Sequence, residues 1–310
     1  METNSLKAAA EGQKASTTAV ATAKKATPPA MFVKSLIDKR MGDIKAALPS
    51  VMTPERFARI ACTAVSASPK LAQACVKSPM TFLGAMMTAA QLGVEPNTPL
   101  GQAYLIPFNN WNKATGQKEL QVQFQLGVYG VIDLAYRSGE VTMIRAEVVY
   151  EKDLFEYELG LDPKLRHVPY KGSDRGEAIY YYGMFKTKSG AVGFNCMSRE
   201  DVLAHAKRFS KSYNSKTGKF SGPWDTDFDS MAKKTCLLAA LKYAPKKSDF
   251  ARAFNADSTV KSDISVNMAE VRNDEVIDVD AGESVQQDEQ AANAASGEAE
   301  AAKPAGEAEA

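Results

Sequence analysis

The chain has 310 residues, of which 45% are hydrophobic, and this is enough to bury one large core or two small ones. Its four cysteines include no Cys-x-x-Cys pair, and neither of its two histidines stands at metal-ligand spacing from cysteines or carboxylates, which argues against a zinc site. No segment resembles a secretory signal or a membrane span. We therefore expect a cytoplasmic protein with reduced thiols and no membrane partner.

Charge is unevenly distributed along the chain. From residue 257 onward the sequence carries fourteen carboxylates and three basic side chains, a net charge of −11, so the whole-chain value of +1 leaves +12 on residues 1–256. A basic body with an acidic tail is typical of proteins that bind nucleic acid or another polyanion. The tail has no aromatic residue and ends in an Ala/Glu-rich stretch, so it cannot bury enough apolar surface to fold. We expect a flexible arm at 1–30, a folded domain at 31–255 and a disordered acidic tail at 256–310.

The first third of the folded domain is predicted to be helical. Apolar spacing indicates a first helix that starts at Met31 and ends before Pro49. The pairs Thr53-Pro54 and Ser78-Pro79 each supply a cap and a first-turn proline for a further helix. Gly93 marks the end of this helical region.

A β-hairpin is predicted next. Two apolar-rich runs, 103–108 and 120–124, flank a polar turn at 112–118. The second run alternates glutamine with apolar residues, so one face of the hairpin is apolar and the other is uncharged but rich in hydrogen-bonding groups. The polar hairpin residues that we expect on a binding surface are Lys113, Lys118, Gln121, Gln123 and Gln125.

A short helix is predicted from Val128 to Arg137, between Gly127 and the pair Ser138-Gly139. Tyr129 and Tyr136 lie seven residues apart on it. We expect Tyr136 in the core, and the pattern leaves Tyr129 open between core and surface.

Three β-rich stretches follow, at 141–150, 178–186 and 191–197, and the last two are expected to pair. A capped helix with acidic residues in its first turn then runs from Ser198 to Arg208. The order of helices, antiparallel strands and helices predicts an α+β fold rather than a doubly wound sheet. It would consist of N-terminal helices, a central antiparallel hairpin and sheet with packed helices, and the disordered acidic C-terminal tail.

The segment 207–219 is basic and contains aromatic residues. Phe209 and Tyr213 alternate there with cations, and cations bind phosphates while aromatic planes stack on unpaired bases. The alternative is a solvated loop. For the following Trp224 we favour a core anchor, because large aromatic side chains dominate cores. The cations of this segment that we assign to the binding surface are Lys207, Arg208, Lys211, Lys216 and Lys219.

The run from Gly222 to Pro245 predicts a turn, one helix and a proline stop. Apolar residues share one face of this helix, while Lys233 and Lys234 flank the opposite side with Leu237 between them. This arrangement suggests that the two ammonium groups face a polyanion. It also suggests that Leu237 faces an apolar surface that excludes water. The pattern fits equally well an ordinary amphipathic helix in which Asp229 pairs with Lys233 at i,i+4.

Several catalytic motifs are missing from the sequence. No Gly-x-x-x-x-Gly-Lys-Ser/Thr motif occurs, so ATP-driven strand exchange or helicase action is not expected. We expect His167 and His205 to be structural. A Mg²⁺-dependent nuclease is left open by spacing alone, but its candidate carboxylates form no recognisable cluster: Asp153, Asp162, Asp174 and Asp201. We therefore expect no catalysis and no required cofactor, with Mg²⁺ only as a counterion of bound nucleic acid.

A series of short motifs runs through the folded part: Ala46–Pro49, Leu92–Pro96, Leu100–Phe108, Phe124–Gly127 with Gly130 and Ile132–Ala135, Arg137–Gly139, Gly222–Trp224 and Met231–Thr235. Together and in this order, over about residues 31–255, they resemble the RecT family of phage and prophage single-strand annealing recombinases. One position departs from the family, which usually has Gly-Tyr-Lys/Arg-Gly where this chain has Gly127-Val128-Tyr129-Gly130. The cation expected beside Gly130 is thus replaced by Tyr129, which could stack on a base or hydrogen-bond a phosphate.

The resemblance implies a protein that coats single-stranded DNA, assembles into rings or helical filaments and pairs complementary strands without ATP. As partners it implies single-stranded DNA, the annealed duplex, a RecE-type exonuclease and a host single-strand DNA-binding protein. It also implies that the hairpin, the glycine-flanked helix with Tyr129 and Arg137, and the helix of Lys233 and Lys234 line a basic groove. The alternative is a coating protein that protects single strands without annealing them.

Overall fold

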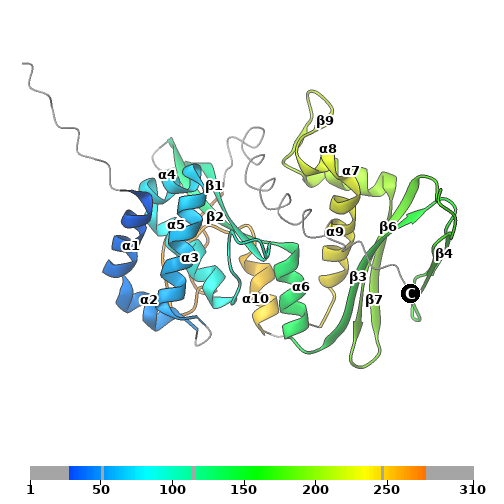
Figure 1. The fold of residues 1–310 in the computed structure, drawn as a ribbon, viewed down its shortest axis with the longest axis horizontal. Helices are drawn as coiled ribbons and strands as arrows, with labels where there is room; N and C mark the ends of the chain where they lie inside the picture. Colours follow the sequence, from blue (N-terminus) through cyan, green and yellow to red (C-terminus); the bar gives the residue numbers. More distant parts are fainter. Residues whose placement is uncertain (1–27, 50–51, 113–115, 246–247, 277–310) are drawn as a thin grey trace, which may run out of the picture.

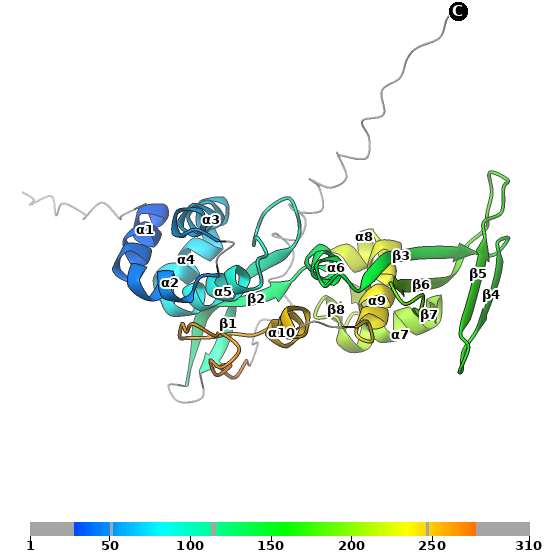
Figure 2. The ribbon, with the colours of Figure 1, turned by 90° about the horizontal axis from the view of Figure 1, so that it is seen from below.

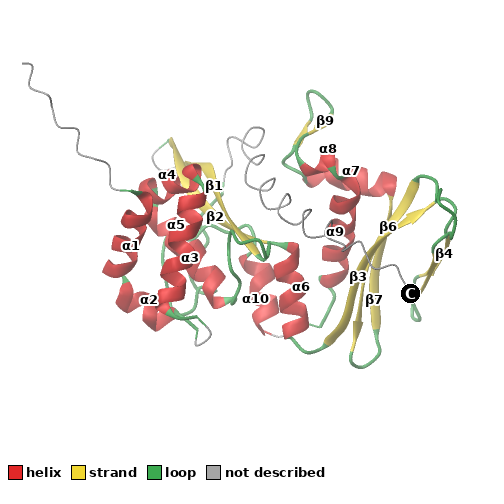
Figure 3. Cartoon of the chain, in the orientation of Figure 1, coloured by secondary structure: helices red, strands yellow, loops and turns green. Residues whose placement is uncertain are grey.

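The computed structural model describes residues 28–49, 52–112, 116–245 and 248–276. Figure 1 shows two lobes side by side along the long axis: a helical lobe that also holds a β-hairpin, and a lobe built on a three-stranded sheet. Helices and antiparallel strands occur in both lobes (Figure 3), which confirms the predicted α+β class.

Five helices form the body of the helical lobe. Four of them begin with proline, whose fixed φ suits the first turn and whose missing amide is not needed there. The Thr53 hydroxyl accepts a hydrogen bond from the Arg56 amide at 3.2 Å and caps α3, as predicted. Every residue of α5 from Thr81 to Ala90 is buried, so α5 is the centre of this lobe. The helices are α1 (Pro29–Lys39), α2 (Met41–Ala47), α3 (Pro54–Ala67), α4 (Pro69–Lys77) and α5 (Pro79–Gln91).

Two helix boundaries in this lobe differ from the prediction. The single helix expected before Pro49 is divided at Arg40, whose backbone leaves the helical region (φ −109°, ψ 13°). The helix α4 is not among the predicted helices, although Ser68-Pro69 repeats the Ser-Pro start signal and the Ser68 hydroxyl accepts from the Leu71 amide.

The predicted hairpin is confirmed as β1 (Ala103–Asn112) and β2 (Gln117–Leu126), paired antiparallel with Leu105 opposite Phe124. Its apolar face packs on α4 and α5, and the Val122 amide donates to the Thr81 hydroxyl of α5 at 3.1 Å. The hairpin is thus fixed to the helical lobe along its inner part.

The middle of the molecule is formed by α6 (Val128–Arg137) and α10 (Ser248–Ala256), which contact each other between the lobes (Figure 2). α6 also contacts α9 and β3 of the sheet lobe. The predicted bounds of α6 are confirmed.

The sheet lobe has strand order β3-β6-β7, all antiparallel: β3 (Val141–Tyr150), β6 (Ala178–Thr187) and β7 (Val192–Ser198). α9 (Phe228–Leu241) lies across this sheet, and at their crossing a Cβ added to Gly183 would lie 2.3 Å from the Leu237 Cα. Helix and strand backbones are therefore in direct contact. α7 (Arg199–Phe209) begins with a capping box between Ser198 and Asp201, as its first-turn carboxylates predict, and α8 (Pro223–Thr226) precedes α9.

Two smaller hairpins extend from the sheet lobe, β4 (Leu154–Glu158) with β5 (Lys164–Val168), and β8 (Tyr213–Asn214) with β9 (Lys219–Phe220). The first is tied to the sheet by the buried carboxylate of Asp153, which accepts from the guanidinium of Arg175 and lies 3.1 Å from His167 Nε2. The Arg175 hydrogen bonds hold the pKa of Asp153 well below its usual range. His167 also meets the Tyr182 hydroxyl at 3.1 Å, in agreement with a structural role.

The predicted start of disorder at residue 256 is wrong for the stretch 257–276, which we call the C-terminal strap. Val260, Lys261 and Met268 of the strap are at most 6% exposed, and the Thr259 carbonyl accepts from the Phe124 amide of β2. A Cβ added to Gly84 of α5 would lie 2.2 Å from the Lys261 carbonyl oxygen, so the strap backbone is seated directly on α5. Residues 1–27 and 277–310, for which an arm and a tail are predicted, lie outside the described residues.

Candidate nucleic-acid interface

Exposed cations gather on the segment from Lys207 to Phe220, which we call the basic arm. All five predicted cations of this arm are exposed: Lys207, Arg208, Lys211, Lys216 and Lys219. Within the described part of the chain, Lys207, Lys216 and Lys219 form no ion pair. Phe209 is 62% exposed, and the guanidinium carbon of Arg208 lies 5.0 Å from its ring centroid. The arm therefore presents cations and an aromatic plane to solvent.

The base of the basic arm is held by an aromatic stack. Trp224 is 9% exposed, and its ring centroid lies 5.9 Å from that of Phe220 and 5.6 Å from that of Phe228. The Asn214 side chain accepts from the amides of Lys216 and Thr217 and shapes the turn at the outer end of the arm. The interpretation of Trp224 as a core anchor is confirmed, because it fixes the arm rather than extending its surface.

The two lysines of α9 are half-buried, and Leu237 between them is buried against β6. The expectation that Leu237 faces an external partner is therefore wrong, because the sheet of the same chain covers it. The alternative i,i+4 pair does not form either. The Asp229 carboxylate instead accepts from the Tyr181 hydroxyl at 2.5 Å and lies 3.9 Å from Arg199, so Lys233 keeps its charge available.

Lys234 lies close to the junction of α9 with the strap. Burial raises the pKa of Asp257, and hydrogen bonds from the Leu126 and Ser258 amides together with the Lys234 ammonium partly oppose that shift. Lys234 is therefore already near a carboxylate of the strap.

The glycines that flank α6 have a packing role. A Cβ on Gly127 would lie 2.1 Å from the Gly101 carbonyl oxygen, and one on Gly130 would lie 2.1 Å from that of Gln102. Gly101 itself has φ +59°. Only glycine lets the 101–102 loop approach the first turn of α6 this closely, so this part of the motif builds a loop–helix joint.

Arg137 belongs to a hydrogen-bond network around the same joint. Its guanidinium donates to Asp133 at 2.6 Å and to the carbonyls of Leu92 and Gly93 at 3.3 and 3.2 Å, at the end of α5. Asp133 also accepts from Gln102 at 3.1 Å. The guanidinium is therefore engaged by intramolecular acceptors, and the geometry gives Arg137 a fold-stabilising role.

The two tyrosines of α6 are both exposed. Tyr129 is 56% exposed beside Gly101 at the start of α6, which begins without a side-chain cap and without an acidic residue in its first turn. Tyr136 is 44% exposed, and its hydroxyl accepts from the Ile144 amide at 3.0 Å. The expected burial of Tyr136 is wrong, because its hydroxyl satisfies an amide of β3 at the surface.

The polar face of the hairpin is covered by the strap. Gln121 and Gln123 are each 8% exposed; Gln121 accepts from Asn110 at 2.9 Å, and Gln123 donates to the Ser258 carbonyl at 2.7 Å. Gln125 is half-buried. While the strap is in place, Gln121 and Gln123 have no surface to offer a ligand. Of the two predicted turn lysines, Lys118 is exposed and Lys113 lies outside the described residues.

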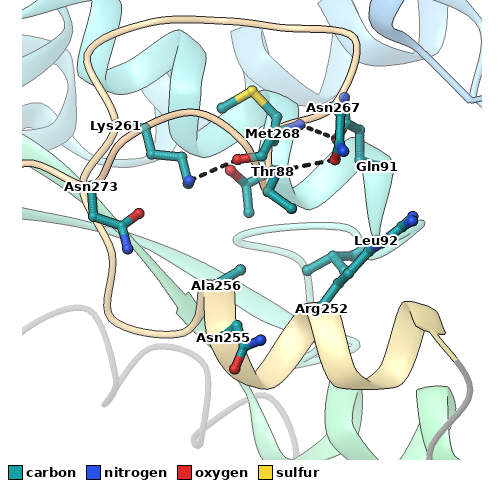
Figure 4. A pocket seen from close by; sticks show the side chains of 11 residues that line it. Thr88, Gln91, Leu92, Arg252, Asn255, Ala256, Lys261, Asn267, Met268 and Asn273 are labelled. Carbon is teal, nitrogen blue, oxygen red and sulfur yellow. Dashed lines mark hydrogen bonds between the residues drawn. The ribbon is translucent and has the colours of Figure 1, made fainter.

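A cavity of about 180 Å³ marks the seam between α5, α10 and the strap (Figure 4). Lys261 lines this seam and points back to the strap, where its ammonium donates to the carbonyls of Met268 and Val271 at 2.7 and 2.6 Å. Gln91 exchanges hydrogen bonds with the strap at Met268 and Val266. Burial lowers the pKa of Lys261, with Asp274 opposing that shift, and the two hydrogen bonds to strap carbonyls hold the strap together.

The candidate metal ligands and the cysteines are the remaining chemistry-bearing residues in the part of the chain that the structure describes. There, no three His, Cys, Asp or Glu side chains are grouped as metal ligands. The four cysteines are free thiols, and burial raises the pKa of Cys75, Cys196 and Cys236 to about 12. No helix among these residues has the length and apolarity needed to cross a bilayer.

These features define an α+β protein with a cationic surface of the kind that binds polyanionic chains. The model of the RecT family matches residues 55–279. Protein RecT of Escherichia coli (strain K12) is 39% identical over 214 residues, which are 69% of this chain and 75% of that protein. The uncharacterized protein YqaK of Bacillus subtilis (strain 168) is 28% identical over 163 residues, 53% of this chain and 50% of that protein. The chain belongs to the RecT family, and it is a recombination-related single-strand annealing protein.

Proposed function

We propose that this protein binds single-stranded DNA through the basic arm and the α9 lysines and anneals complementary strands as an oligomer, without a nucleotide cofactor. The observation that carries the proposal is the exposure of five cations between residues 207 and 219, beside an exposed phenyl ring, in a chain of the RecT family. Cations that neutralise phosphates release condensed counterions, and this supplies sequence-independent affinity.

Annealing then requires little further chemistry from the protein. Two polyanionic strands repel each other, and a surface that neutralises one strand while leaving its bases accessible lowers that barrier. Base pairing supplies the sequence specificity and the free energy of the product. In this proposal Mg²⁺ is only a DNA counterion, and the absence of a P-loop motif from the sequence supports independence from ATP.

Tyr129 is proposed as a contact at the start of α6. The first turn of this helix lacks both a side-chain cap and an acidic residue, so its partial positive charge is not compensated from within the turn. A phosphate or a base held there would meet the exposed ring of Tyr129. Gln121, Gln123 and Arg137 are left out of the proposed surface because intramolecular partners occupy them.

The central test uses complementary fluorescent oligonucleotides without ATP or GTP. Acceleration of their pairing at sub-stoichiometric to equimolar protein supports the proposal. Slower pairing together with tight single-strand binding would instead support the alternative hypothesis, a protein that coats single strands without annealing them. Loss of full-length labelled DNA on addition of Mg²⁺ would support the hypothesis of a Mg²⁺-dependent nuclease.

The oligomeric state and the partners need separate tests. Mass photometry on single strands of increasing length should show assemblies that grow with strand length. Co-purification with a RecE-type exonuclease and with a host single-strand DNA-binding protein tests the two proposed partners. The free thiols motivate the cytoplasm as the proposed compartment.

The acidic segment 277–310 carries nine carboxylates and one lysine, and we propose that it limits non-specific binding or contacts partners. Truncation after Val276 removes this charge and keeps the strap. It should raise affinity for non-specific DNA at low salt by a few-fold, since like charges no longer compete with the phosphates. Unchanged affinity, oligomer size and partner binding would argue against any such role. Truncation after Asn255 is not a clean test, because it also removes the strap.

A further inference from the structure

Trp111 stands at the outer end of β1, where the hairpin extends beyond the helices. Side chains two residues apart along a strand lie on the same face, so Trp111 continues the face that carries Leu105. Burial falls along this face: Leu105 is 0% exposed, Leu120 is 8% exposed and Trp111 is 38% exposed. The face is apolar and buried at Leu105 and Leu120, it becomes half-buried at Asn109, and it ends in an exposed indole.

The packing of Trp111 differs from that of the second tryptophan in the chain. Trp224 is 9% exposed and is stacked between Phe220 and Phe228. Within the described part of the chain, Trp111 contacts no other aromatic ring. An indole that is 38% exposed forfeits roughly two-fifths of the burial free energy that makes tryptophan a core residue. Stability of the lobe therefore explains only the buried part of this ring, and the exposed part remains free to meet a ligand.

A cation stands beside the ring. Strand pairing places Lys118 directly opposite Trp111, and opposed residues in an antiparallel pair project from the same face with Cβ atoms about 5 Å apart. Lys118 is exposed. A planar ring next to an ammonium group matches the two ends of one nucleotide, an unpaired base and its phosphate.

We propose that Trp111 is a stacking site for an unpaired base of the bound single strand, with Lys118 contacting the adjacent phosphate. The proposal rests on the proposed function and adds a base-binding subsite to it. Figure 1 shows the hairpin and the β8–β9 end of the basic arm both towards the upper edge of the view, the hairpin beside α4 and α5 and the arm above α8 and α9. A strand bound along this edge would meet aromatic planes at two places, Trp111 and Phe209.

The two tryptophans allow a direct test by fluorescence. In the Trp224→Phe variant all indole emission comes from Trp111, and in Trp111→Phe it comes from Trp224. Titration with oligo(dT) should quench the emission of Trp111 and shift its wavelength, and it should protect the Trp111 ring from quenching by iodide. The emission of Trp224 should stay constant. If Trp224→Phe does not fold, 5-fluorotryptophan labelling of the unsubstituted protein gives two ¹⁹F signals, and only the Trp111 signal should move with DNA.

Affinity gives the second readout. Trp111→Ala should weaken single-strand binding by about 5- to 150-fold, the range for one base–aromatic stack, and leave the salt dependence unchanged because no cation is lost. Trp111→Phe should restore most of the affinity. Met31→Ala, which removes a 62%-exposed apolar side chain on α1, is the matched control and should bind like the unsubstituted protein.

Two results would overturn the proposal, and they can be told apart. Unchanged Trp111 emission at DNA concentrations that saturate the anisotropy of a labelled oligonucleotide removes the stacking site but keeps DNA binding. If the unsubstituted protein causes no change in the anisotropy of the labelled oligonucleotide, it does not bind single-stranded DNA. That result would contradict the proposed function and, with it, the base-binding subsite.

Discussion

The basic arm and the polar face of the β1–β2 hairpin carry similar sequence signals, but the structure gives them opposite environments. Both combine polar residues with apolar or aromatic ones, and both lie in segments that the sequence assigns to a binding surface. In the arm the cations are exposed around Phe209. In the hairpin Gln121 and Gln123 are 8% exposed beneath the strap.

This difference shows what alternation can and cannot predict. Alternation says which residues share a face of a strand, but another segment of the chain decides whether that face meets solvent. The strap comes from the part of the sequence with the strongest acidic bias, yet it is packed because Val260 and Met268 anchor it and Lys261 closes it. Four variants test whether the two surfaces differ in DNA binding in this way.

The largest effect is expected from removing the charge of the basic arm. Replacing its five cations with alanine should lower the slope of log affinity against log salt by about 3.5 units and weaken binding on the order of 1,000-fold at 0.1 M salt. Titrations of a labelled single strand at several salt concentrations measure both. The matched control removes five cations of the sheet lobe, at positions 152, 164, 166, 186 and 188. Equal losses in both variants would show that net charge, and not the arm, carries the affinity.

The strap should be dislodged by Gly84→Ala. The new Cβ would lie 2.2 Å from the Lys261 carbonyl oxygen, so we expect a loss of about 1 to 3 kcal/mol in unfolding free energy and faster hydrogen exchange at 257–276. Gly42→Ala is the control. It lies in α2 with nothing within 4 Å of the added Cβ, and it should stabilise the protein by about 0.5 to 1 kcal/mol. A higher DNA affinity in Gly84→Ala would mean that the covered hairpin face binds DNA after all.

The α9 lysines should contribute less than the arm. Lys233→Ala with Lys234→Ala is expected to lower the salt slope by about 1.4 units and to weaken binding about 25-fold at 0.1 M salt, equally across sequences. Circular dichroism should show a normal fold, since both side chains are only half-buried. An unchanged slope in a folded variant would remove α9 from the interface.

The smallest effect is expected from Gln123→Ala. It removes the donor to the Ser258 carbonyl and should cost about 1 kcal/mol of unfolding free energy. The salt slope and the affinity should stay the same. A loss of DNA affinity without a loss of stability would return Gln123 to the binding surface.

Local signals in the sequence are sufficient to predict most of the elements of the fold. The hairpin, the helix after Gly127 and the capped helix after Ser198 occur where turn residues, glycines and caps predict them. These elements depend on interactions within a few residues. The same holds for Trp224, whose partners Phe220 and Phe228 are four residues away on either side.

What the sequence could not reveal depends on contacts between distant segments. The strap meets α5 at Gly84 through Lys261, and no local pattern links two residues so far apart. Leu237 points outward on a helical wheel, but the sheet covers that side of α9. Arg137 has the composition of a phosphate contact, and only its place beside the end of α5 shows that it serves the fold.

The backbone contact between Gly183 and Leu237 has a consequence for recognition. With no side chain between strand and helix, α9 has little freedom to slide or tilt on the sheet. The positions from which Lys233 and Lys234 project are therefore fixed before any DNA arrives. Binding needs to order only the two side chains, because the conformational entropy of the helix that carries them is already lost on folding.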